Sequence, residues 1–456
     1  MLVASLGVSW IAAVVLALVD GRRRAVAWAA VAALGAAFVL LAVLTGLVAE
    51  GGDREQVAGG WPAGVGITLR ADPLGTIFAL TSSGVLLAAL AYEVIAGVRS
   101  RMFPALVLFL ATGLTGLFLT ADVFSFYVFF ELSMIAAYVL STYGDEPRQL
   151  AAGFIFAVVN LLGSFLFLLG IAAIYHVTGT LGMDAVAERI ANVEPSAAIL
   201  IAVVIFVAFG VKLGLFPFHF WLPTVYTSAT PGVAAMLSGA VANIGSYGIL
   251  RFGAGILPNE LELGAVVLII LGTASIVYGA LQATSRRTAE EVLAYSAIGQ
   301  AGYVLIAVGV GGAVGYAAAV VYAVVNSLNK TLLFLSVEVR GWLVGAAFAV
   351  GAFSVAGVPP AAGFFGKVEL FRAGIDADSA ALVLLIFLGG ALSFVYMFQI
   401  YQRDFWRGAR SAEASPAALR AVPVAIAVLV VGLGLWPEPL LAAGRQAADV
   451  LLEASR

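Results

Sequence analysis

The chain has 456 residues, of which 62% are hydrophobic and only 11% are charged, and its mean hydropathy is +1.07. Soluble domains carry about 25% charged residues, so this composition excludes an ordinary soluble core and favours a protein embedded in a lipid bilayer. A formal net charge of -3 without a basic patch argues against a nucleic-acid partner, and the lack of cysteine excludes disulfides and thiolate-held metals.

Apolar runs of about 20 residues, the length that spans a bilayer as a helix, recur along the whole chain. We therefore predict an all-α transmembrane protein of about fourteen helices. The first run precedes a basic cluster at 22–24, the reverse of the order in a secretory signal, so we interpret it as a membrane helix. The predicted spans are 2–19, 25–48, 73–97, 103–119, 122–143, 150–176, 195–222, 231–253, 260–283, 291–309, 312–337, 342–372, 377–402 and 417–436.

The arginines predict how the chain is oriented in the membrane. If the N-terminus lies outside, the inside loops hold about twice as many arginines as the outside segments, which makes the inside the cytoplasm. Both termini would then lie outside. The inside arginines are Arg22, Arg23, Arg24, Arg99, Arg101, Arg148, Arg286, Arg287, Arg340, Arg403, Arg407, Arg410 and Arg420. The outside arginines are Arg54, Arg70, Arg189, Arg251, Arg372, Arg445 and Arg456.

Two of the predicted spans are interrupted by glycine and proline. The run 195–222 contains Gly214 and Pro217, and the run 342–372 contains a Gly-Val-Pro-Pro sequence at 357–360. Such breaks survive at membrane depth only where protein or water satisfies the freed backbone groups. Paired breaks in inverted repeats point to a transport site, although prolines also simply kink membrane helices. We predict four parts: helices one to three (1–102), two inverted five-helix repeats (103–253 and 260–402), and a C-terminal helix with a tail (403–456).

Two polar connections stand out from the apolar runs. The segment 49–72 is rich in glycine and is expected to turn. The segment 179–194 is expected to form a short amphipathic helix on the surface.

Three lysines are the most informative residues. The chain has twenty arginines, nearly all in loops or at helix ends, and three lysines, Lys212, Lys330 and Lys367, all inside apolar runs. Arginine keeps its proton in essentially any environment, whereas burial favours the neutral form of lysine, so lysine can bind and release protons there. Each mid-membrane lysine costs roughly 2.5–3.5 kcal/mol on insertion scales. We predict that they belong to a proton path; the alternative is that they reach the interface.

Few carboxylates lie inside the predicted spans. Glu131 is near the middle of its helix, and a buried carboxylate either takes up a proton or pairs with a cation. Lys212, two helices later, is its natural partner. Glu93 and Asp122 are nearer to helix ends and are expected at the interface.

Other polar residues in the spans could relay protons or hold water. His219 could carry a proton near pH 7, or it could be a packed histidine bonded to a freed carbonyl. Asn243, Asn326 and Asn329 recur near the lysines, and Ser238 lies between them; they could hold waters, or they could bond neighbouring helices. No cluster of charged or aromatic residues marks a soluble substrate pocket. No cofactor motif is found, no catalytic residue is assigned, and the location of any metal or cation site stays open.

Five segments, in chain order over about 300 residues, resemble the antiporter-like subunits shared by respiratory complex I, membrane-bound hydrogenases and Mrp antiporters. They are Phe-Phe-Glu-Leu-Ser-Met-Ile-Ala-Ala-Tyr-Val-Leu (129–140), Val-Lys-Leu-Gly-Leu-Phe-Pro-Phe-His-Phe-Trp-Leu-Pro (211–223), Val-Leu-Ala-Tyr-Ser-Ala-Ile-Gly-Gln-Ala-Gly-Tyr (292–303), Asn-Lys-Thr-Leu-Leu-Phe-Leu (329–335) and Ala-Gly-Val-Pro-Pro-Ala-Ala-Gly-Phe-Phe-Gly-Lys (356–367). Within this family, the segments 59–67, 175–183 and 436–445 look most like the Mrp D-type subunits.

The resemblance implies a fold of fourteen helices with two inverted repeats and a hydrated row of charged residues along the mid-plane. Glu131 matches the family's acidic residue that pairs with a lysine, and Lys212 matches that lysine. Lys330 matches a lysine on the second broken helix, and Lys367 matches the terminal lysine after the break. The family's subunits work in complexes, so partner subunits are implied.

The sequence departs from the family pattern in three places. Asn243 stands where many members carry a central lysine, and Asn326 stands where a histidine often occurs. The connection 337–342 is shorter than usual. Since an asparagine cannot titrate, the first two differences put a continuous relay in doubt.

Three functions are compatible with these residues. The first is proton translocation coupled to sodium exchange, in a multi-pass subunit of the cell's inner (plasma) membrane. The second is proton pumping in a redox complex such as complex I or a hydrogenase, and the third is a scaffold subunit that conducts no protons. The first is the function we expect.

Overall fold

The computed structural model describes residues 1–60, 66–144, 146–407 and 415–454. Eleven helices in this part of the chain are long and apolar enough to cross a membrane. Three shorter apolar helices, Leu2–Ala17, Phe103–Phe118 and Trp342–Ala356, fall on three further predicted spans. The predicted class, an all-α protein with many membrane helices, is confirmed, while the inverted relation of the two repeats stays a prediction.

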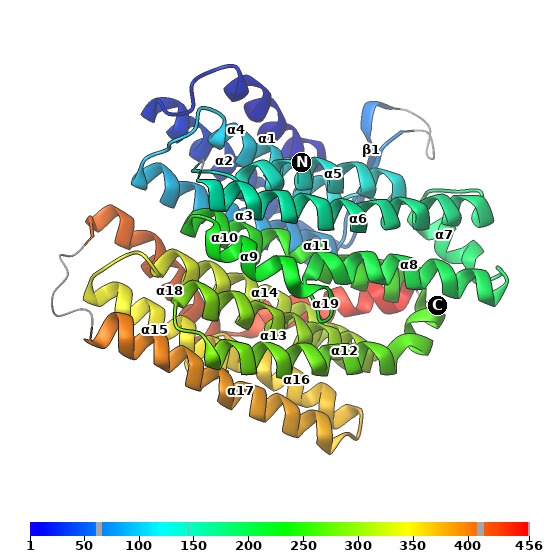
Figure 1. The fold of residues 1–456 in the computed structure, drawn as a ribbon. Coiled ribbons are helices and arrows are strands. Elements are labelled where there is room, and N and C mark those ends of the chain that lie inside the picture. Colours follow the sequence, from blue (N-terminus) through cyan, green and yellow to red (C-terminus); the bar gives the residue numbers. More distant parts are fainter. Residues whose placement is uncertain (61–65, 145, 408–414, 455–456) are drawn as a thin grey trace.

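Long helices lie side by side with roughly parallel axes (Figure 1). The α-helices are α1 (Leu2–Ala17), α2 (Arg24–Gly51), α3 (Pro73–Ala96), α4 (Phe103–Phe118), α5 (Val123–Ser141), α6 (Pro147–Thr178), α7 (Met183–Ile190), α8 (Pro195–Leu213), α9 (Trp221–Ser228), α10 (Pro231–Met236), α11 (Asn243–Gly248), α12 (Pro258–Ser285), α13 (Ala289–Val310), α14 (Gly312–Ser336), α15 (Trp342–Ala356), α16 (Gly363–Asp376), α17 (Ala380–Ile400), α18 (Ala417–Leu435) and α19 (Glu438–Ala454).

Both predicted helix breaks are confirmed. Helix α8 ends at Gly214, which has a left-handed φ of 67°, and the chain then continues through a short 3-10 turn (Phe218–Phe220) into α9. Helix α15 ends at Gly357, with φ of 83°, before α16 begins. A Cβ atom at position 357 would lie 2.5 Å from Cγ of Lys367, so glycine lets that lysine's stem pack against the break.

A third irregular span was not expected from the sequence. Between Pro231 and Ala254 the chain alternates α10 and α11 with two π-helical segments, Leu237–Val241 and Ile249–Ala254. This span is almost wholly buried, and so are α13 and α14. Single π-turns inside helices are rare and frequently occur at functional sites.

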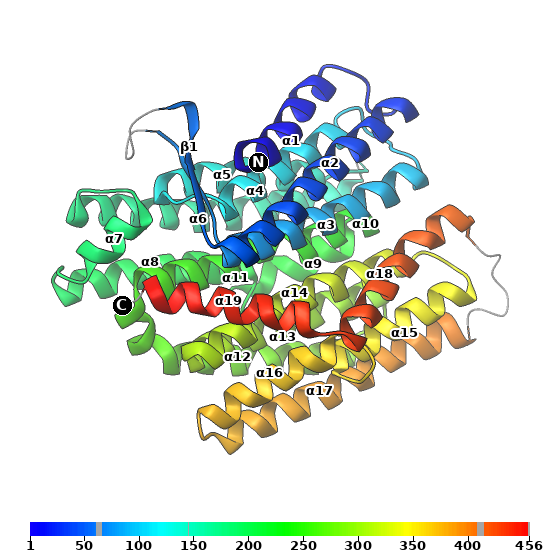
Figure 2. The same ribbon diagram turned by 180° about the vertical axis from the view of Figure 1, so that it is seen from behind.

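Helix α14 connects the two halves of the molecule. It packs against α13, α15 and α16 of the second half and against α3 and α10 of the first. The C-terminal α19 lies along the back of the molecule, in contact with α14 and α3 (Figure 2). This central position leaves α14 with few exposed residues.

The two polar connections fold in different ways. The predicted surface helix in 179–194 is confirmed as α7. The segment 49–72 forms a hairpin of β1 (Arg54–Val57) and β2 (Thr68–Ala71), which the sequence had not indicated. Residues 61–65, which belong to the family-like segment 59–67, lie outside the described residues. Arg410 and Arg456, which contribute to the predicted orientation, also lie outside them.

One of the arginines assigned to the outside is buried in the protein. Arg251 is buried within its span, where its guanidinium lies 2.6 Å from the carboxylate of Asp72 and donates to the Tyr247 hydroxyl at 3.0 Å. Asp72 also caps α3 by accepting a hydrogen bond from the amide of Gly75. A buried charge needs such a partner, and the sequence could not show it because the two residues are 179 positions apart.

Candidate proton path

All three lysines are buried, which contradicts the alternative that they reach the interface. Lys212 is 5% exposed, Lys330 0% and Lys367 4%. The structure records no carboxylate within 4.0 Å of any of the three among the residues it describes. They are therefore held by neutral groups, which is unusual because an isolated buried ammonium is expensive.

Lys212 lies in the last turn of α8, against α6. Its Nζ donates to the backbone oxygen of Asn160 at 2.9 Å and to the hydroxyl of Ser164 at 3.2 Å, and lies 4.3 Å from the centroid of the Phe130 ring. Lys212 and Asn160 also line an enclosed cavity of about 10 Å³. That volume is about the space of one water molecule in a polar site.

The expected contact ion pair between Glu131 and Lys212 is not present. Glu131 is on α5 and directly follows Phe130, whose ring contacts the Nζ atom of Lys212. The Oε1 atom of Glu131 is buried without a hydrogen-bond partner. A buried, unpartnered carboxylate oxygen favours a bridging water. The role of Glu131 in a proton path stays a prediction.

Lys330 lies on an unbroken helix, so its expected match to a lysine on the second broken helix was wrong. It is in the C-terminal third of α14 and donates to the backbone oxygen of Leu293 at 3.1 Å and to the Ser296 hydroxyl at 2.9 Å, both on α13. The lysine on the second broken helix is Lys367, in the first turns of α16.

A continuous row of hydrogen bonds leads away from Lys330. The Ser296 hydroxyl lies 3.1 Å from the Tyr396 hydroxyl, and the Gln300 amide donates to the same Tyr396 oxygen at 3.4 Å. The Tyr322 hydroxyl then donates to the Gln300 side-chain oxygen. The hydroxyls of Ser296, Tyr396 and Tyr322 both donate and accept, so they can pass a proton by reorientation, whereas the Gln300 amide only holds the hydroxyls on its two sides in place.

The row ends beside Lys367. Its Nζ lies 3.1 Å from the centroid of the Tyr303 ring and 5.2 Å from that of Tyr322. This Nζ atom is buried and donates no hydrogen bond to the described residues, and the Tyr303 hydroxyl is also without a partner. The structure therefore brings Lys330 and Lys367 to the two ends of one polar row.

The tyrosines in and beside this row were missed in the sequence. Tyr303, Tyr322 and Tyr396 are fully or almost fully buried, and each is a hydroxyl-bearing residue in an otherwise apolar helix. A tyrosine in the middle of a membrane span was the available signal, because a buried hydroxyl usually finds a partner.

Asn243 ties three helices together. Its Nδ2 donates to the Ser82 hydroxyl on α3 and to the backbone oxygen of Gly239, each at 3.1 Å, and its Oδ1 accepts from the Ser327 hydroxyl on α14 at 3.0 Å. These contacts favour the alternative that Asn243 bonds neighbouring helices. That it holds water between the lysines stays a prediction.

The other predicted relay residues are scattered. His219 stacks on Phe216 and contacts the tilted ring of Tyr278, with its Nδ1 buried and unpartnered. Ser238 donates to its own helix at Ala234. The Oδ1 atoms of Asn326 and Asn329, on α14 beside Lys330, are buried without partners.

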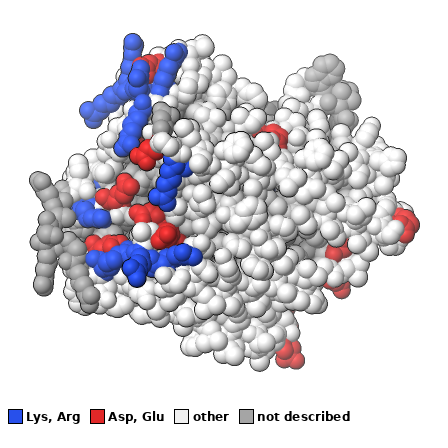
Figure 3. Space-filling view, in the orientation of Figure 1, with Lys and Arg blue, Asp and Glu red and all other residues white. Residues whose placement is uncertain are grey.

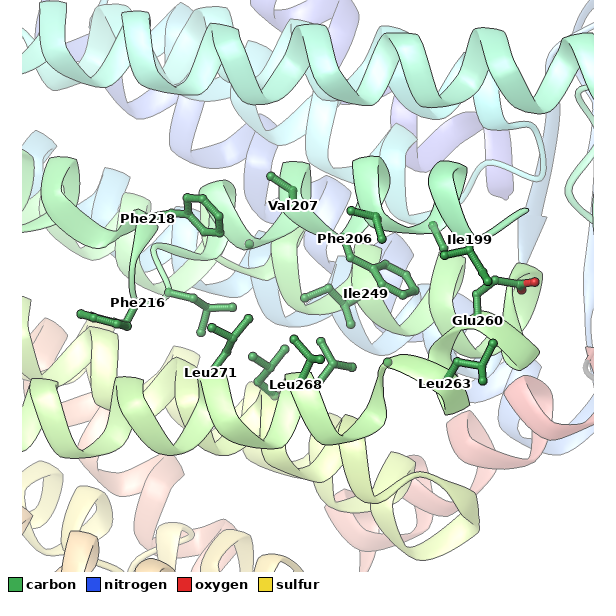
Figure 4. A pocket seen from close by; sticks show the side chains of 17 residues that line it. Ile199, Phe206, Val207, Phe216, Phe218, Ile249, Glu260, Leu263, Leu268 and Leu271 are labelled. Atoms are coloured by element: carbon green, nitrogen blue, oxygen red, sulfur yellow. The ribbon is translucent and has the colours of Figure 1, made fainter. Parts of the chain in front are cut away.

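The described residues hold no metal cluster, and one of the cavities between their helices is apolar. No group of three or more His, Asp or Glu that could hold a metal is found in the described ranges. A cavity of about 360 Å³ between α8 and α12 is lined by apolar side chains such as Phe206, Ile249 and Leu268, with Glu260 at one end (Figure 4). Apart from Glu260, the lining offers no group for proton or ion chemistry.

Known proteins similar to this chain are membrane transport subunits. Residues 120–393 match the family described as "NADH:quinone oxidoreductase/Mrp antiporter, TM". The chain is 30% identical over 422 residues to the D-type subunit of the Na(+)/H(+) antiporter of Alkalihalophilus pseudofirmus, covering 87% of this chain and 85% of that one. It is 32% identical over 364 residues to "Putative antiporter subunit mnhD2" of Staphylococcus haemolyticus, covering 75% and 73%.

Solved structures of similar fold agree with the sequence relatives. A chain of the Mrp complex from Dietzia sp. DQ12-45-1b has a TM-score of 0.90 at 26% identity, covering 99% of this chain and 97% of that one. A chain of respiratory complex I from Thermus thermophilus has a TM-score of 0.78 at 27% identity, covering 96% and 98%. A chain of an archaeal membrane-bound sulfane sulfur reductase shares the fold with a TM-score of 0.91 at 24% identity, covering 100% of this chain and 99% of that one. The protein thus belongs to the NADH:quinone oxidoreductase/Mrp antiporter family of multi-pass membrane subunits.

Proposed function

We propose that this chain is a proton-translocating subunit of a multisubunit Na+/H+ antiporter, in which buried lysines and hydroxyl groups pass protons through the middle of the membrane. Relatives named as antiporter subunits and the fold of an Mrp complex chain support this function. The observation that carries it is the row of hydrogen bonds from Lys330 toward Lys367. Partner subunits, protons and sodium ions are the implied partners.

The surroundings of the lysines suit a proton carrier. Burial without a carboxylate partner makes the charged form of a lysine costly, so a proton bound there is released readily. Hydroxyl and carbonyl oxygens, such as those of Ser164 and Ser296, still offer enough hydrogen bonds to hold the charged form for a time. Each lysine can therefore alternate between two protonation states without a large rearrangement.

Glu131 and Lys212, in the first half of the path, are not in direct contact with each other. Glu131 and Lys212 are separated by more than contact distance, and the cavity beside Lys212 has room for about one water molecule. We propose that water completes the connection between this acid and this lysine. Glu131 would then hold a proton that Lys212 receives.

The test uses the whole complex, reconstituted in vesicles with a pH-sensitive dye. Glu131→Gln and Lys212→Ala are each expected to abolish sodium-driven proton movement while the complex still assembles. Glu262→Gln, which neutralises an exposed acid on α12, is the matched control and should leave transport unchanged. Full activity in either the Glu131 or the Lys212 variant would contradict the proposal.

A second candidate is proton pumping in a redox complex. The fold similarity to a chain of complex I and to a chain of the sulfane sulfur reductase favours it, since the same lysines could serve there. Sodium dependence separates the two: an antiporter subunit requires sodium for proton movement in vesicles, and a redox pump requires an electron donor. A scaffold subunit would show neither.

A further inference from the structure

One end of the molecule carries an acidic pocket that the proton path does not use. Positive and negative side chains gather at that end, while most of the visible remainder is uncharged (Figure 3). The pocket has a volume of about 590 Å³ and lies on the side that the arginine distribution assigns to the cytoplasm. Its charged lining residues are Glu93, Arg99, Glu146, Arg148, Glu290, Glu291 and Glu338.

Acids outnumber bases in this pocket by five to two, although it lies on the arginine-rich side. Partial burial, together with repulsion from Glu290, raises the pKa of Glu338 at the rim. The same excess of negative charge concentrates cations in the pocket, because a cleft lined by one sign of charge raises the local concentration of the opposite ion.

Glu93 is the one acid of the pocket that is deeply buried, at 5% exposure. Its Oε1 accepts hydrogen bonds from the Thr230 hydroxyl at 2.8 Å and from the amide of Gly232 at 3.2 Å. Its Oε2 accepts none from the described residues, and no lysine or arginine nitrogen among them lies within 4.0 Å of the carboxylate. A buried carboxylate with a free oxygen and no counter-charge is stabilised by taking up a proton or by binding a cation.

The backbone around Glu93 is adapted to hold it at this place. A Cβ atom at position 232 would lie 2.5 Å from both Cγ and Oε1 of Glu93, so only glycine permits this approach. The Thr230 hydroxyl donates its hydrogen bond to Glu93, and the lone pairs of its oxygen remain available to bind a cation. A carboxylate beside a hydroxyl is an oxygen-only set of ligands, the kind that hard cations prefer.

We propose that Glu93, with Thr230, binds a small monovalent cation, H+ or Na+, at the base of this cytoplasmic pocket. This inference rests on the proposed function and adds the place where the exchanged ion enters the chain. Helix α3 carries Glu93 and also Ser82, which bonds Asn243. The two positions are about 16 Å apart along the helix axis, so α3 connects the pocket to the buried interior.

The experiment uses the assembled complex in inside-out vesicles, where the cytoplasmic face is accessible. Glu93→Gln keeps the size of the side chain and an oxygen that can accept from Thr230 and Gly232, but it removes the charge. If the ion is Na+, the apparent KM for Na+ should rise about tenfold or more. If the ion is H+, the pH profile of the initial rate should shift while the KM for Na+ stays as in the wild type. An unchanged KM together with an unchanged pH profile would overturn the proposal.

Two further variants guard against a trivial loss of folding. Thr230→Val removes one cation ligand without changing charge. It should shift the same quantity as Glu93→Gln, either the KM for Na+ or the pH profile, by a smaller factor. Glu188→Gln, an exposed acid on α7 at the other end of the molecule, should change neither. If Glu93→Gln does not assemble, wild-type behaviour of Thr230→Val in both parameters would overturn the proposal.

Equilibrium binding separates this inference from the proposed function. Radioactive sodium binding and proton release on titration are measured on the purified complex, without transport. If the wild-type complex shows no sodium-coupled flux, the proposed function fails. The site still stands if Glu93→Gln lowers sodium binding or removes a titrating proton, and it fails if both equal the wild type.

Discussion

The Nζ atom of Lys367 lies 3.1 Å from the centroid of the Tyr303 ring, and it donates no hydrogen bond to the described residues. Lys330 differs, because it donates two hydrogen bonds to α13. An aromatic face attracts a cation but cannot accept a proton, so the ring can hold Lys367 in its charged form without competing for the proton. The two lysines of the second half are thus held by different kinds of group.

Replacing Tyr303 tests this contact. Tyr303→Phe keeps the ring and removes only an unpartnered hydroxyl, so proton flux should stay within about twofold of the wild type. Tyr303→Leu removes the ring, and the loss of a desolvated cation–π contact of about 2 kcal/mol should lower flux severalfold. Flux is measured in reconstituted complexes, normalised to assembled protein. Equal flux in the two variants would show that the ring serves packing alone.

Replacing a lysine by arginine tests whether the lysine must release its proton. Lys330→Arg and Lys367→Arg keep a positive charge, but arginine does not release its proton under any ordinary condition. Each should impair transport nearly as much as the corresponding change to alanine. The initial rate of proton movement is the measurement. Substantial activity of both arginine variants would mean that the lysines act as fixed charges.

The row of hydrogen bonds between the lysines can be cut at one atom. Tyr322→Phe removes the hydroxyl that donates to Gln300 and leaves the ring in place. Flux should fall about tenfold or more, whereas Tyr316→Phe on the same helix, whose hydroxyl is in no hydrogen bond of the described row, should be close to the wild type. Wild-type flux in Tyr322→Phe would place the path elsewhere.

Asn243 is expected to matter for packing. Asn243→Leu removes the hydrogen bonds to the hydroxyls of Ser82 and Ser327, and interhelical contacts of this kind are worth about 0.6 kcal/mol each on average. We expect a lower melting temperature of the complex and flux per assembled complex within about twofold of the wild type. A complete loss of flux at unchanged stability would instead indicate a water chain at this residue.

A pH-dependent contact lies on the outer surface, where Arg70 of β2 binds Asp184 of α7. The hydrogen bond from Arg70 lowers the pKa of Asp184. A lowered pKa means that the contact stabilises this region above the ordinary Asp range, and that the stability is lost as pH falls through the lowered value. Hydrogen exchange of the hairpin and α7 should therefore stay slow into mildly acidic solution.

The matched variant for this contact is Arg70→Gln. Without the guanidinium, exchange in the hairpin and α7 should already be faster at neutral pH and should depend less on pH. Exchange identical to the wild type at every pH would show that the ion pair does not hold these segments together. Glu188→Gln, on the same helix, serves as the control.

Much of the architecture could be predicted from local sequence. The apolar runs predicted the membrane helices because each span must satisfy its own backbone hydrogen bonds, which makes the signal local and continuous. The breaks at Gly214 and Gly357 were predicted for the same reason, since glycine and proline act within one turn. The contrast between buried lysines and mostly peripheral arginines likewise came from the sequence, with Arg251 as an exception.

Contacts between distant segments could not be predicted in this way. The pairing of Asp72 with Arg251, and the approach of Glu93 to Gly232, join positions more than a hundred residues apart. Lys212 was expected to contact Glu131 because opposite charges in one membrane usually pair, but the helices place it on Ser164 and a phenyl ring instead. Sequence determined which segments span the membrane, because that follows from the hydropathy of each run. Only the tertiary structure decided which of them meet, because the partners come from the packing of helices that the sequence does not order in space.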